Sequence, residues 1–177
     1  GTQAGDLYRI TNADGSASST NISDSSFPNG NISCVELGAS ENELLVTFSN
    51  YGVTSVWYSI DGGSNWTSKE GNLPDMPVRW ALFNPEDRSE VILATELGVW
   101  RTEDFDSNNP TWSSSNIGLA NVRVDMLQMR DSDNEVIAIT HGRGLYSSSG
   151  FAGETQAGEV TANFSANPRS ITVGESV

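Results

Sequence analysis

The sequence predicts an all-β protein made of β-propeller blades, each with four antiparallel strands, that form part of a ring. Three observations support this prediction: short runs rich in Val, Ile, Thr and aromatic residues, segments rich in Gly, Asn, Asp and Pro between them, and the recurrence of both about every 45 residues. No segment has a sustained helical apolar period, so we expect few helices. A β-sandwich is the alternative, but its strands need not repeat in sequence.

Each repeat contains four strand positions, which we number first to fourth along the chain. In an up-and-down meander, the first–second and third–fourth turns lie at one end of the blade, and the second–third and fourth–first loops lie at the other. Residues 1–11 match the second and third strands of later repeats, so the first unit is entered partway. The expected strands are 32–37, 78–83 and 122–127 (first); 43–49, 90–96 and 135–141 (second); 55–61, 98–104 and 144–150 (third); 65–71 and 111–118 (fourth).

Residues 1–151 are therefore predicted to be the C-terminal blades of a larger propeller, whose last repeat stops after its third strand. Propellers close with four or more blades, so the remaining blades of the same chain are expected partners. Trp57, Trp100 and Tyr146 recur at one strand position and are expected in the core between blades. Residues 152–160 lose the aromatic residues and are predicted to be a linker.

The balance of charge limits the partners of this chain. It has 9 basic and 23 acidic residues, with a formal net charge of −14, which repels phosphate backbones, so no nucleic-acid partner is expected. No run approaches the roughly 20 apolar residues of a membrane span. An acidic, Lys-poor composition rich in Ser, Asn and Asp is typical of a secreted or cell-surface protein.

The stretch SIDGGSNW, which begins at Ser59, resembles the Asp-box (BNR) pattern Ser/Thr-x-Asp-x-Gly-x-x-Trp. This pattern occurs in sialidases, sortilin-type receptors, xyloglucan-degrading glycosidases and uncharacterised bacterial propellers. The match comprises Ser59, Asp61, Gly63 and Trp66, with an additional glycine at Gly62. The resemblance implies a β-propeller, an extracellular and bacterial setting, and a turn between a third and a fourth strand.

This turn is expected to serve the fold, and the alternative is that Asp61 is an acid or a metal ligand. An Asp at a turn accepts hydrogen bonds from backbone N–H groups downstream, and Trp66 can pack back over the hairpin. No second carboxylate lies at a fixed offset. A degenerate copy in the next repeat keeps Thr102, Asp104 and Trp112 around a longer insert.

Residues 161–177 resemble the opening of a PKD-type domain, which is an Ig-like β-sandwich. The resemblance rests on the segments F-x-A-x-P, which begins at Phe164, and V-x-x-G-x-x-V, which begins at Val173. It implies that a PKD-like domain of the same chain is a further partner.

In families with this kind of turn, ligands approach the opposite loop end, so we expect function there. The loop THGRGLY holds the only His of the chain; His141 could act as a general base or bind a sugar hydroxyl, or else hydrogen-bond the neighbouring blade. Arg143 could clamp a carboxylate or pair with an acid. The candidate ligand-binding residues are Tyr51, Arg79, Glu96, Arg123, His141 and Arg143.

Arg79 and Arg123 are aligned as the second residues of first strands, and we expect both at the mouth of the central channel. An arginine cluster there resembles the carboxylate-binding arginines of sialidases. No arginine-containing FRIP-type motif and no Tyr/Glu nucleophile pair is present, so no catalytic residue is assigned. The sequence gives no distance between acids such as Asp75, Glu96 and Asp125.

Two classes of function remain open. In the first, the chain is the C-terminal part of a secreted Asp-box propeller that binds glycans or proteins as a scaffold module, with polysaccharide or glycoprotein as its partner. In the second, it is part of a glycoside hydrolase, exo-sialidase-like or xyloglucanase-like, which requires two carboxylates at a defined separation. The first class is favoured because no acid pair can be assigned, and no metal or cofactor is expected.

Overall fold

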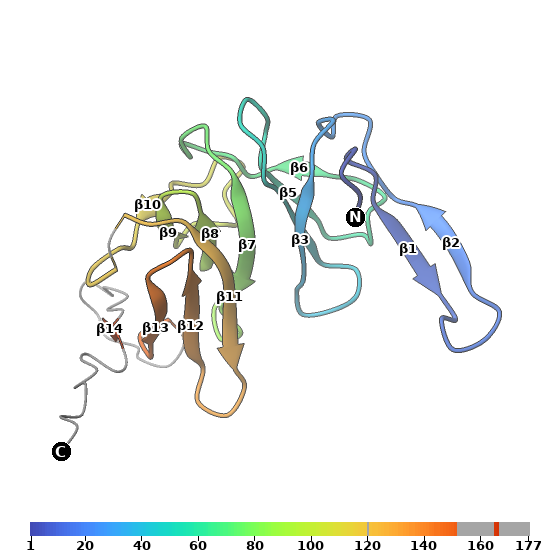
Figure 1. Cartoon of the computed structure of the whole chain (residues 1–177). Coiled ribbons are helices and arrows are strands. Elements are labelled where there is room, and N and C mark those ends of the chain that lie inside the picture. Colours follow the sequence, from blue (N-terminus) through green and yellow to red (C-terminus); the bar gives the residue numbers. More distant parts are fainter. Residues whose placement is uncertain (120, 152–164, 167–177) are drawn as a thin grey trace, which may run out of the picture.

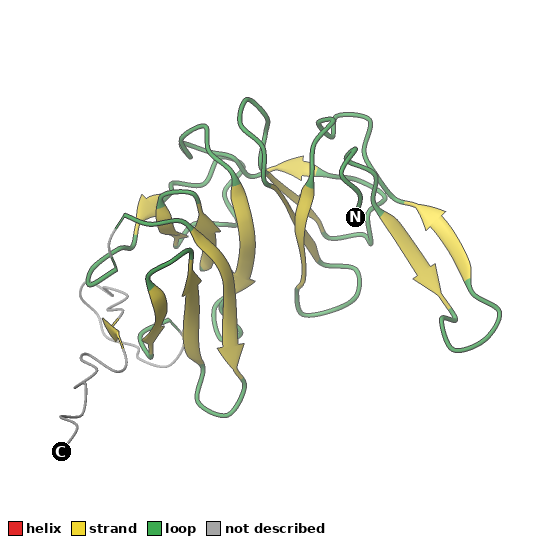
Figure 2. Cartoon of the chain, in the orientation of Figure 1, coloured by secondary structure: helices red, strands yellow, loops and turns green. Residues whose placement is uncertain are grey.

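The structure, a computed structural model of the 177-residue chain, describes residues 1–119, 121–151 and 165–166. Within these residues the backbone forms strands and no helix, and Figure 2 shows strands joined only by loops and turns. The strands form three four-stranded sheets and one two-stranded sheet, all antiparallel and all in chain order. The predicted all-β class and the four-stranded antiparallel unit are therefore confirmed.

In two of the sheets the first three strands follow the predicted boundaries closely, and the fourth strands are shorter than predicted. In both, every residue of the second strand is buried, because that strand has a neighbour on each edge and packed side chains on each face. The strands of blade 1 are β3 (Ile32–Leu37), β4 (Leu44–Phe48), β5 (Val56–Ser59) and β6 (Thr67–Ser68). Those of blade 2 are β7 (Val78–Phe83), β8 (Val91–Thr95), β9 (Gly98–Thr102) and β10 (Ser113–Ser114).

Blade 3 has a fourth strand that the repeat pattern did not predict. Its strands are β11 (Val124–Arg130), β12 (Glu135–Thr140), β13 (Gly144–Ser148) and β14 (Ser165–Ala166). β14 pairs antiparallel with β13 and has only two residues, too few for a periodic signal. The predicted linker at 152–160 and most of the predicted PKD-like segment lie outside the described residues, so those domain boundaries stay a prediction.

The remaining sheet contains β1 (Tyr8–Thr11) and β2 (Ser18–Asn21), at the third and fourth positions of a repeat. Figure 1 shows the four sheets following one another along an arc. The first strand of each full blade contacts the first strand of the next, β3 with β7 and β7 with β11. This succession is that of consecutive blades in a partial ring.

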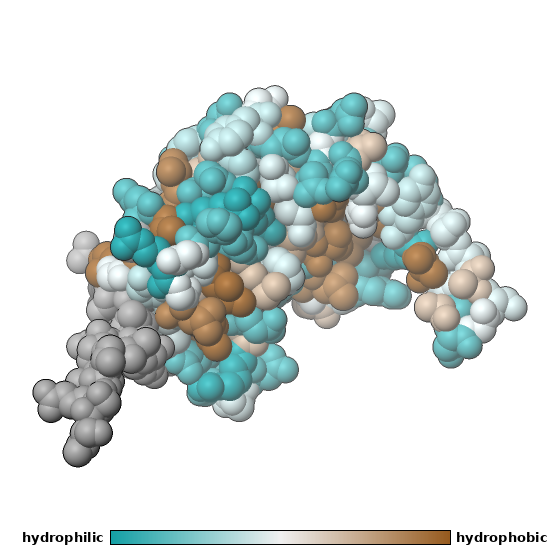
Figure 3. Space-filling view, viewed as in Figure 1, coloured by the Kyte–Doolittle hydropathy of each residue, from teal (hydrophilic) through white to brown (hydrophobic). Residues whose placement is uncertain are grey.

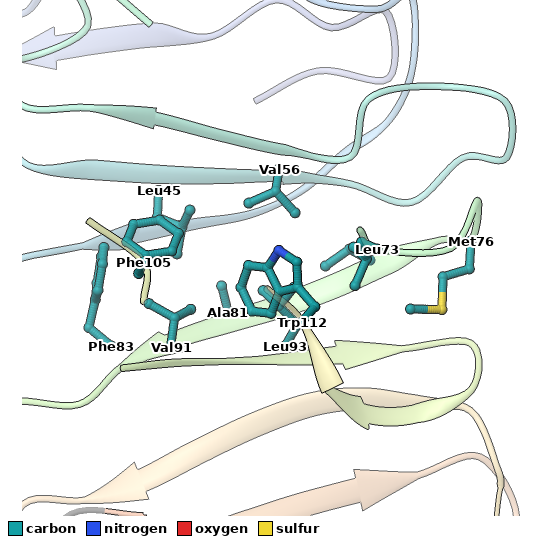
Figure 4. Close-up of a cluster of buried hydrophobic side chains, with 11 residues drawn as sticks. Leu45, Val56, Leu73, Met76, Ala81, Phe83, Val91, Leu93, Phe105 and Trp112 are labelled. Carbon is teal, nitrogen blue, oxygen red and sulfur yellow. The ribbon is translucent and has the colours of Figure 1, made fainter. Parts of the chain in front are cut away.

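The core lies between neighbouring blades. Leu45 and Val56 of blade 1 pack with Phe83, Leu93 and Trp112 of blade 2 in one buried apolar cluster (Figure 4). A second cluster joins blades 2 and 3 in the same way. A third cluster joins the β1–β2 sheet to blade 1 and contains the buried Trp57. Trp100 and Tyr146, at the same strand position, are half-buried and pack against the other two clusters, as expected.

A bulge at the second residue of each first strand corrects the predicted alignment of the repeats. The register shifts across Ser33, Arg79 and Asp125, which are evenly spaced along the chain. The residue equivalent to Arg79 is therefore Asp125, and Arg123 lies before β11. The sequence Val-Arg-Val offers two apolar registers two residues apart, and only strand pairing distinguishes them.

Candidate functional site

Five charged or titratable side chains of blades 2 and 3 meet at the end that carries the second–third loops. We call them the charged cluster: Arg79, Glu96, Arg123, Asp125 and His141. Arg79 donates from Nη2 to Glu96 Oε2 at 2.6 Å, and its Nε lies 3.9 Å from Asp125 Oδ1. One guanidinium thus links carboxylates from two blades.

Asp125 lies at the centre of the cluster. It accepts a hydrogen bond from Arg123 Nε at 2.5 Å, and His141 Nδ1 lies 3.3 Å from its Oδ2. The bulges at Arg79 and Asp125 direct both side chains toward this end, because a bulge re-aims the residue it inserts. The His141 side chain is 68% exposed, so the cluster is open to solvent.

The surroundings of Asp125 keep it ionised. Burial raises its pKa, but the hydrogen bond and charge of Arg123, the hydrogen bond with His141 and the charge of Arg79 outweigh burial, so the net pKa lies below its usual range. At neutral pH Asp125 is therefore a carboxylate that orients the imidazole through Nδ1. It can accept hydrogen bonds from sugar hydroxyls, whereas a general acid needs a raised pKa.

Two of the predicted site residues stand apart from the cluster. Tyr51 is 63% exposed in the second–third loop of blade 1, where the Gly52 N–H donates to Asp75 Oδ1 at 2.6 Å. Arg143 is exposed in the turn after β12 and makes no hydrogen bond or ion pair within the described part of the chain. Both side chains are therefore accessible at the loop end without being held in one position.

The structure thus brings together four of the six predicted residues and adds one. Sequence reasoning named Asp125 only as one acid among several. The even spacing of Ser33, Arg79 and Asp125 could have singled out Asp125 from the sequence. That spacing becomes visible when β11 is aligned with the other first strands at its bulge. The predicted Arg79–Arg123 pair is not a free anion-binding pair, because each guanidinium contacts a carboxylate.

The SIDGGSNW turn at residues 59–66 holds its carboxylate with local donors. Ser59 Oγ donates to Asp61 Oδ1 at 2.9 Å, and Asn65 donates from its backbone N–H at 2.8 Å and from Nδ2 at 2.6 Å. These bonds, those of Asn65 first, lower the pKa of Asp61 to about 2. Gly62 and Gly63 adopt φ values of 72° and 89°, where a Cβ would be strained.

The degenerate copy has the same geometry despite its insert. Thr102 Oγ1 donates to Asp104 Oδ1 at 2.6 Å, and the Thr111 N–H donates to the same oxygen at 2.8 Å. Lys69, the only Lys of the chain, contacts the insert. Its Nζ donates to Ser107 O at 2.6 Å and lies 5.3 Å from the Phe105 ring centroid. Lys69 is 4% exposed, and burial lowers its pKa.

The two Trp residues of these turns bind the preceding sheet. Trp66 Nε1 donates to Ile22 O at 2.9 Å, and Trp112 Nε1 donates to Lys69 O at 3.0 Å. Ile22 follows β2 and Lys69 follows β6, so each indole reaches the fourth strand of the blade before its own. We expected Trp66 to pack back over its own hairpin; its Nε1 also donates to Gly63 O at 3.1 Å, but the longer-range contact joins two sheets.

The described residues contain no group of three or more His, Cys, Asp or Glu side chains that could hold a metal ion. The acidic turn after β11 is held instead by Arg130, which pairs with Asp133 and Glu135. Across the same residues no helix is long and apolar enough to cross a membrane.

Comparisons with known proteins identify the fold. No protein-family model matches the sequence, and no curated protein matches it. The structure is similar to a GH74 xyloglucanase from Xanthomonas campestris, with TM-score 0.56 and 12% identity over 83% of this chain. It is also similar to a GH74 enzyme from Niastella koreensis, with TM-score 0.58 and 17% identity over 93% of this chain. The chain spans 28% of the length of each of these structures.

Proposed function

We propose that this chain supplies blades to a secreted, bacterial Asp-box propeller that binds polysaccharide or glycoprotein at the end carrying the charged cluster. The observation that supports this most is the convergence of Arg79, Glu96, Arg123, Asp125 and His141 from two blades on one solvent-open end. Their donors and acceptors match the hydroxyls of a sugar. The enzyme from Xanthomonas campestris with a similar fold is a xyloglucanase, so the fold is compatible with a polysaccharide ligand.

The 59–66 turn is proposed to be the structural Asp-box of the blade. Ser59, Asp61, Gly62, Gly63 and Trp66 satisfy one another or bind the preceding sheet. These side chains are occupied in holding the turn, which supports a structural role for it and favours binding at the other end.

Binding is tested with a panel of soluble polysaccharides that includes neutral xyloglucan and an acidic polygalacturonate. We expect one class to retard the protein in affinity electrophoresis. The double variant His141→Ala, Arg143→Ala should weaken that binding about tenfold, which corresponds to roughly 1.4 kcal/mol, with Tm nearly unchanged because both side chains are exposed.

The matched control is Arg130→Ala, an exposed arginine at the opposite end of β11. It should bind like the wild type. Binding that survives the double variant, or that is lost together with a large drop in Tm, would contradict the proposed role of the loop end.

A second candidate is a glycoside hydrolase of which this chain forms part. Glu96 and Asp125 contact the same Arg79 guanidinium, so their two carboxylates lie close together. The two carboxylates of a glycosidase lie roughly 5 to 9.5 Å apart. The lowered pKa of Asp125 suits a nucleophile or base and does not suit the acid.

Hydrolysis of xyloglucan by the full-length protein, followed by reducing-end release, tests this candidate. Turnover that falls at least a hundredfold in both Glu96→Gln and Asp125→Asn supports a catalytic pair, since one acid–base group contributes about that much. Turnover that persists in both variants places the chemistry outside the cluster.

A further inference from the structure

A groove of about 420 Å³ lies between the β1–β2 sheet and blade 1. The wall on β3 carries two large apolar side chains that are well exposed, Val35 at 40% and Leu37 at 59%. On the β1 side, Leu7 and Arg9 face blade 1, and Arg9 Nη2 donates to Glu41 O at 2.8 Å. Figure 3 shows apolar surface beside β3 and a hollow between it and the β1–β2 sheet.

The equivalent positions of the later blades are better covered. Val35 corresponds by register to Ala81 and Leu127, both 0% exposed. Leu37 corresponds to Phe83, which is 2% exposed, and to Met129, which is half-buried and packs against the core between blades 2 and 3. The strand type, the bulge and the apolar pattern are the same in all three first strands. Val35 and Leu37 are therefore exposed because nothing in the described residues covers them, and not because their own strand is built differently.

The missing cover can be identified from blade 1. There, Leu45 of the second strand and Val56 of the third pack over the first strand of blade 2. In the β1–β2 sheet, Leu7 occupies the place of Val56 and is buried against blade 1. No described residue occupies the place of Leu45, because that sheet has no strand at the second position.

The edge of β1 that faces the groove is also open. Within the described residues β1 pairs only with β2, whereas β5, β9 and β13 each pair with a second strand on the corresponding edge. An open apolar edge attracts another strand, and native proteins usually cover it. The groove thus offers an unpaired backbone edge and an apolar wall to the same occupant.

We propose that the groove takes a β-hairpin of this same protein, outside residues 1–177, which supplies the first and second strands of the β1–β2 sheet. Its second strand pairs antiparallel with β1 and is buried along its whole length, like β4 and β8. The second strand places a residue at the position of Leu45 over Val35 and Leu37, and the first strand lies beside β3 as β3 lies beside β7. The hairpin completes a fourth blade and closes the inter-blade core on this side.

Hydrogen–deuterium exchange on the 177-residue chain and on its natural full-length protein tests the proposal. Peptides that cover β1 and β3 should exchange at least tenfold more slowly in the full-length protein, because β1 gains a partner strand and β3 gains cover. Peptides from the middle of blade 2, where Leu93 is already 0% exposed, are the internal reference and should differ little.

The variant Leu37→Asp provides a second measurement, with Ile60→Asp, at a position 71% exposed, as the control. Leu37→Asp should lower the Tm of the full-length protein by several degrees more than that of the 177-residue chain, and Ile60→Asp should affect both alike. Equal exchange of β1 in the two proteins would overturn the proposal. So would a dimer of the 177-residue chain, seen by light scattering, that Leu37→Asp separates, since a second copy would then be the occupant.

Discussion

The Asp61 carboxylate shows how single residues define the ends of blade strands. It accepts hydrogen bonds from Ser59 and Asn65, and these join the end of β5 to the start of β6. Because the acceptor is ionised, each bond is stronger than a neutral one. The favourable state of this turn is therefore the one with Asp61 deprotonated.

This predicts a defined loss of stability in acid. The pKa of Asp61 is lowered from 3.8 to about 2 in the folded protein, so its contribution to stability is complete above the ordinary pKa and is lost as the pH falls toward the folded value. The Tm difference between wild type and Asp61→Asn should be largest near pH 5 to 7 and should shrink below about pH 4. Asp131→Asn, in the exposed turn after β11, is the control; a difference that stays constant with pH would contradict the assignment.

Glu36 predicts a pH dependence of stability that is opposite in sign to that of Asp61. Burial against blade 2 raises its pKa from 4.5 to about 7, although Arg88 and the Phe83 backbone oppose the shift. A raised carboxyl pKa favours the protonated folded state, so stability is lost as the pH rises from about 4.5 through 7.

Glu36→Gln should remove that pH dependence and raise the Tm at pH 8 by a few degrees relative to wild type. Thermal melts between pH 4 and pH 8 measure it. A variant whose Tm follows the wild-type curve in parallel would show that Glu36 does not titrate in this range.

At the scale of elements, the third–fourth turns join one sheet to the next. Trp66 and Trp112 each donate an indole hydrogen bond to the fourth strand of the preceding sheet, and Trp112 is 2% exposed. The chain therefore uses the same indole contact at two successive junctions, between the β1–β2 sheet and blade 1 and between blades 1 and 2.

Replacing Trp112 with Ala should destabilise the protein by about 3–5 kcal/mol, because a large buried ring and a buried hydrogen bond are lost. Trp66→Ala should cost less, since that indole is half-buried. Urea denaturation measures both, with Trp112→Phe expected to recover part of the loss. Equal effects of the two alanine variants would argue against burial as the cause.

The sequence predicted the elements better than their alignment. The first three strands of blades 1 and 2 begin and end within about two residues of the expected runs, because apolar alternation and Gly-rich turns are local signals. The fourth strands, β6 and β10, are shorter than the runs expected for them. The repeat that contains β11 was aligned two residues off, since Val122 and Val124 are equally good apolar partners for Val78. Register depends on pairing across the sheet, which a local pattern does not contain.

The same limit explains how much of the site was foreseen. The repeat frame placed Glu96 and His141 on equivalent loops, and both belong to the charged cluster. The pairing of Arg79 with Glu96 and Asp125 was not foreseen, because those contacts cross between strands or blades. Arg123 and Asp125 are only two residues apart, and their pairing was missed because Arg123 was aligned with Arg79. Distances between blades are set by the packing of side chains and do not follow from the sequence pattern of a single blade.

On the scale of the whole molecule, the two ends of the blades have different characters. The end with the 59–66 turn carries side chains that are occupied in holding the fold. The opposite end carries the charged cluster together with Tyr51 and Arg143, which are exposed. In a protein with a net charge of −14, an end whose arginines balance its acids repels an acidic ligand less than a surface with unpaired acids does.

Hydrogen–deuterium exchange with and without the polysaccharide that binds most strongly is the most direct test of where this protein recognises its ligand. We predict slower exchange in peptides that cover residues 121–126 and 140–144 and no change in peptides that cover residues 59–66. Protection at residues 59–66 with none at the charged cluster would contradict the account.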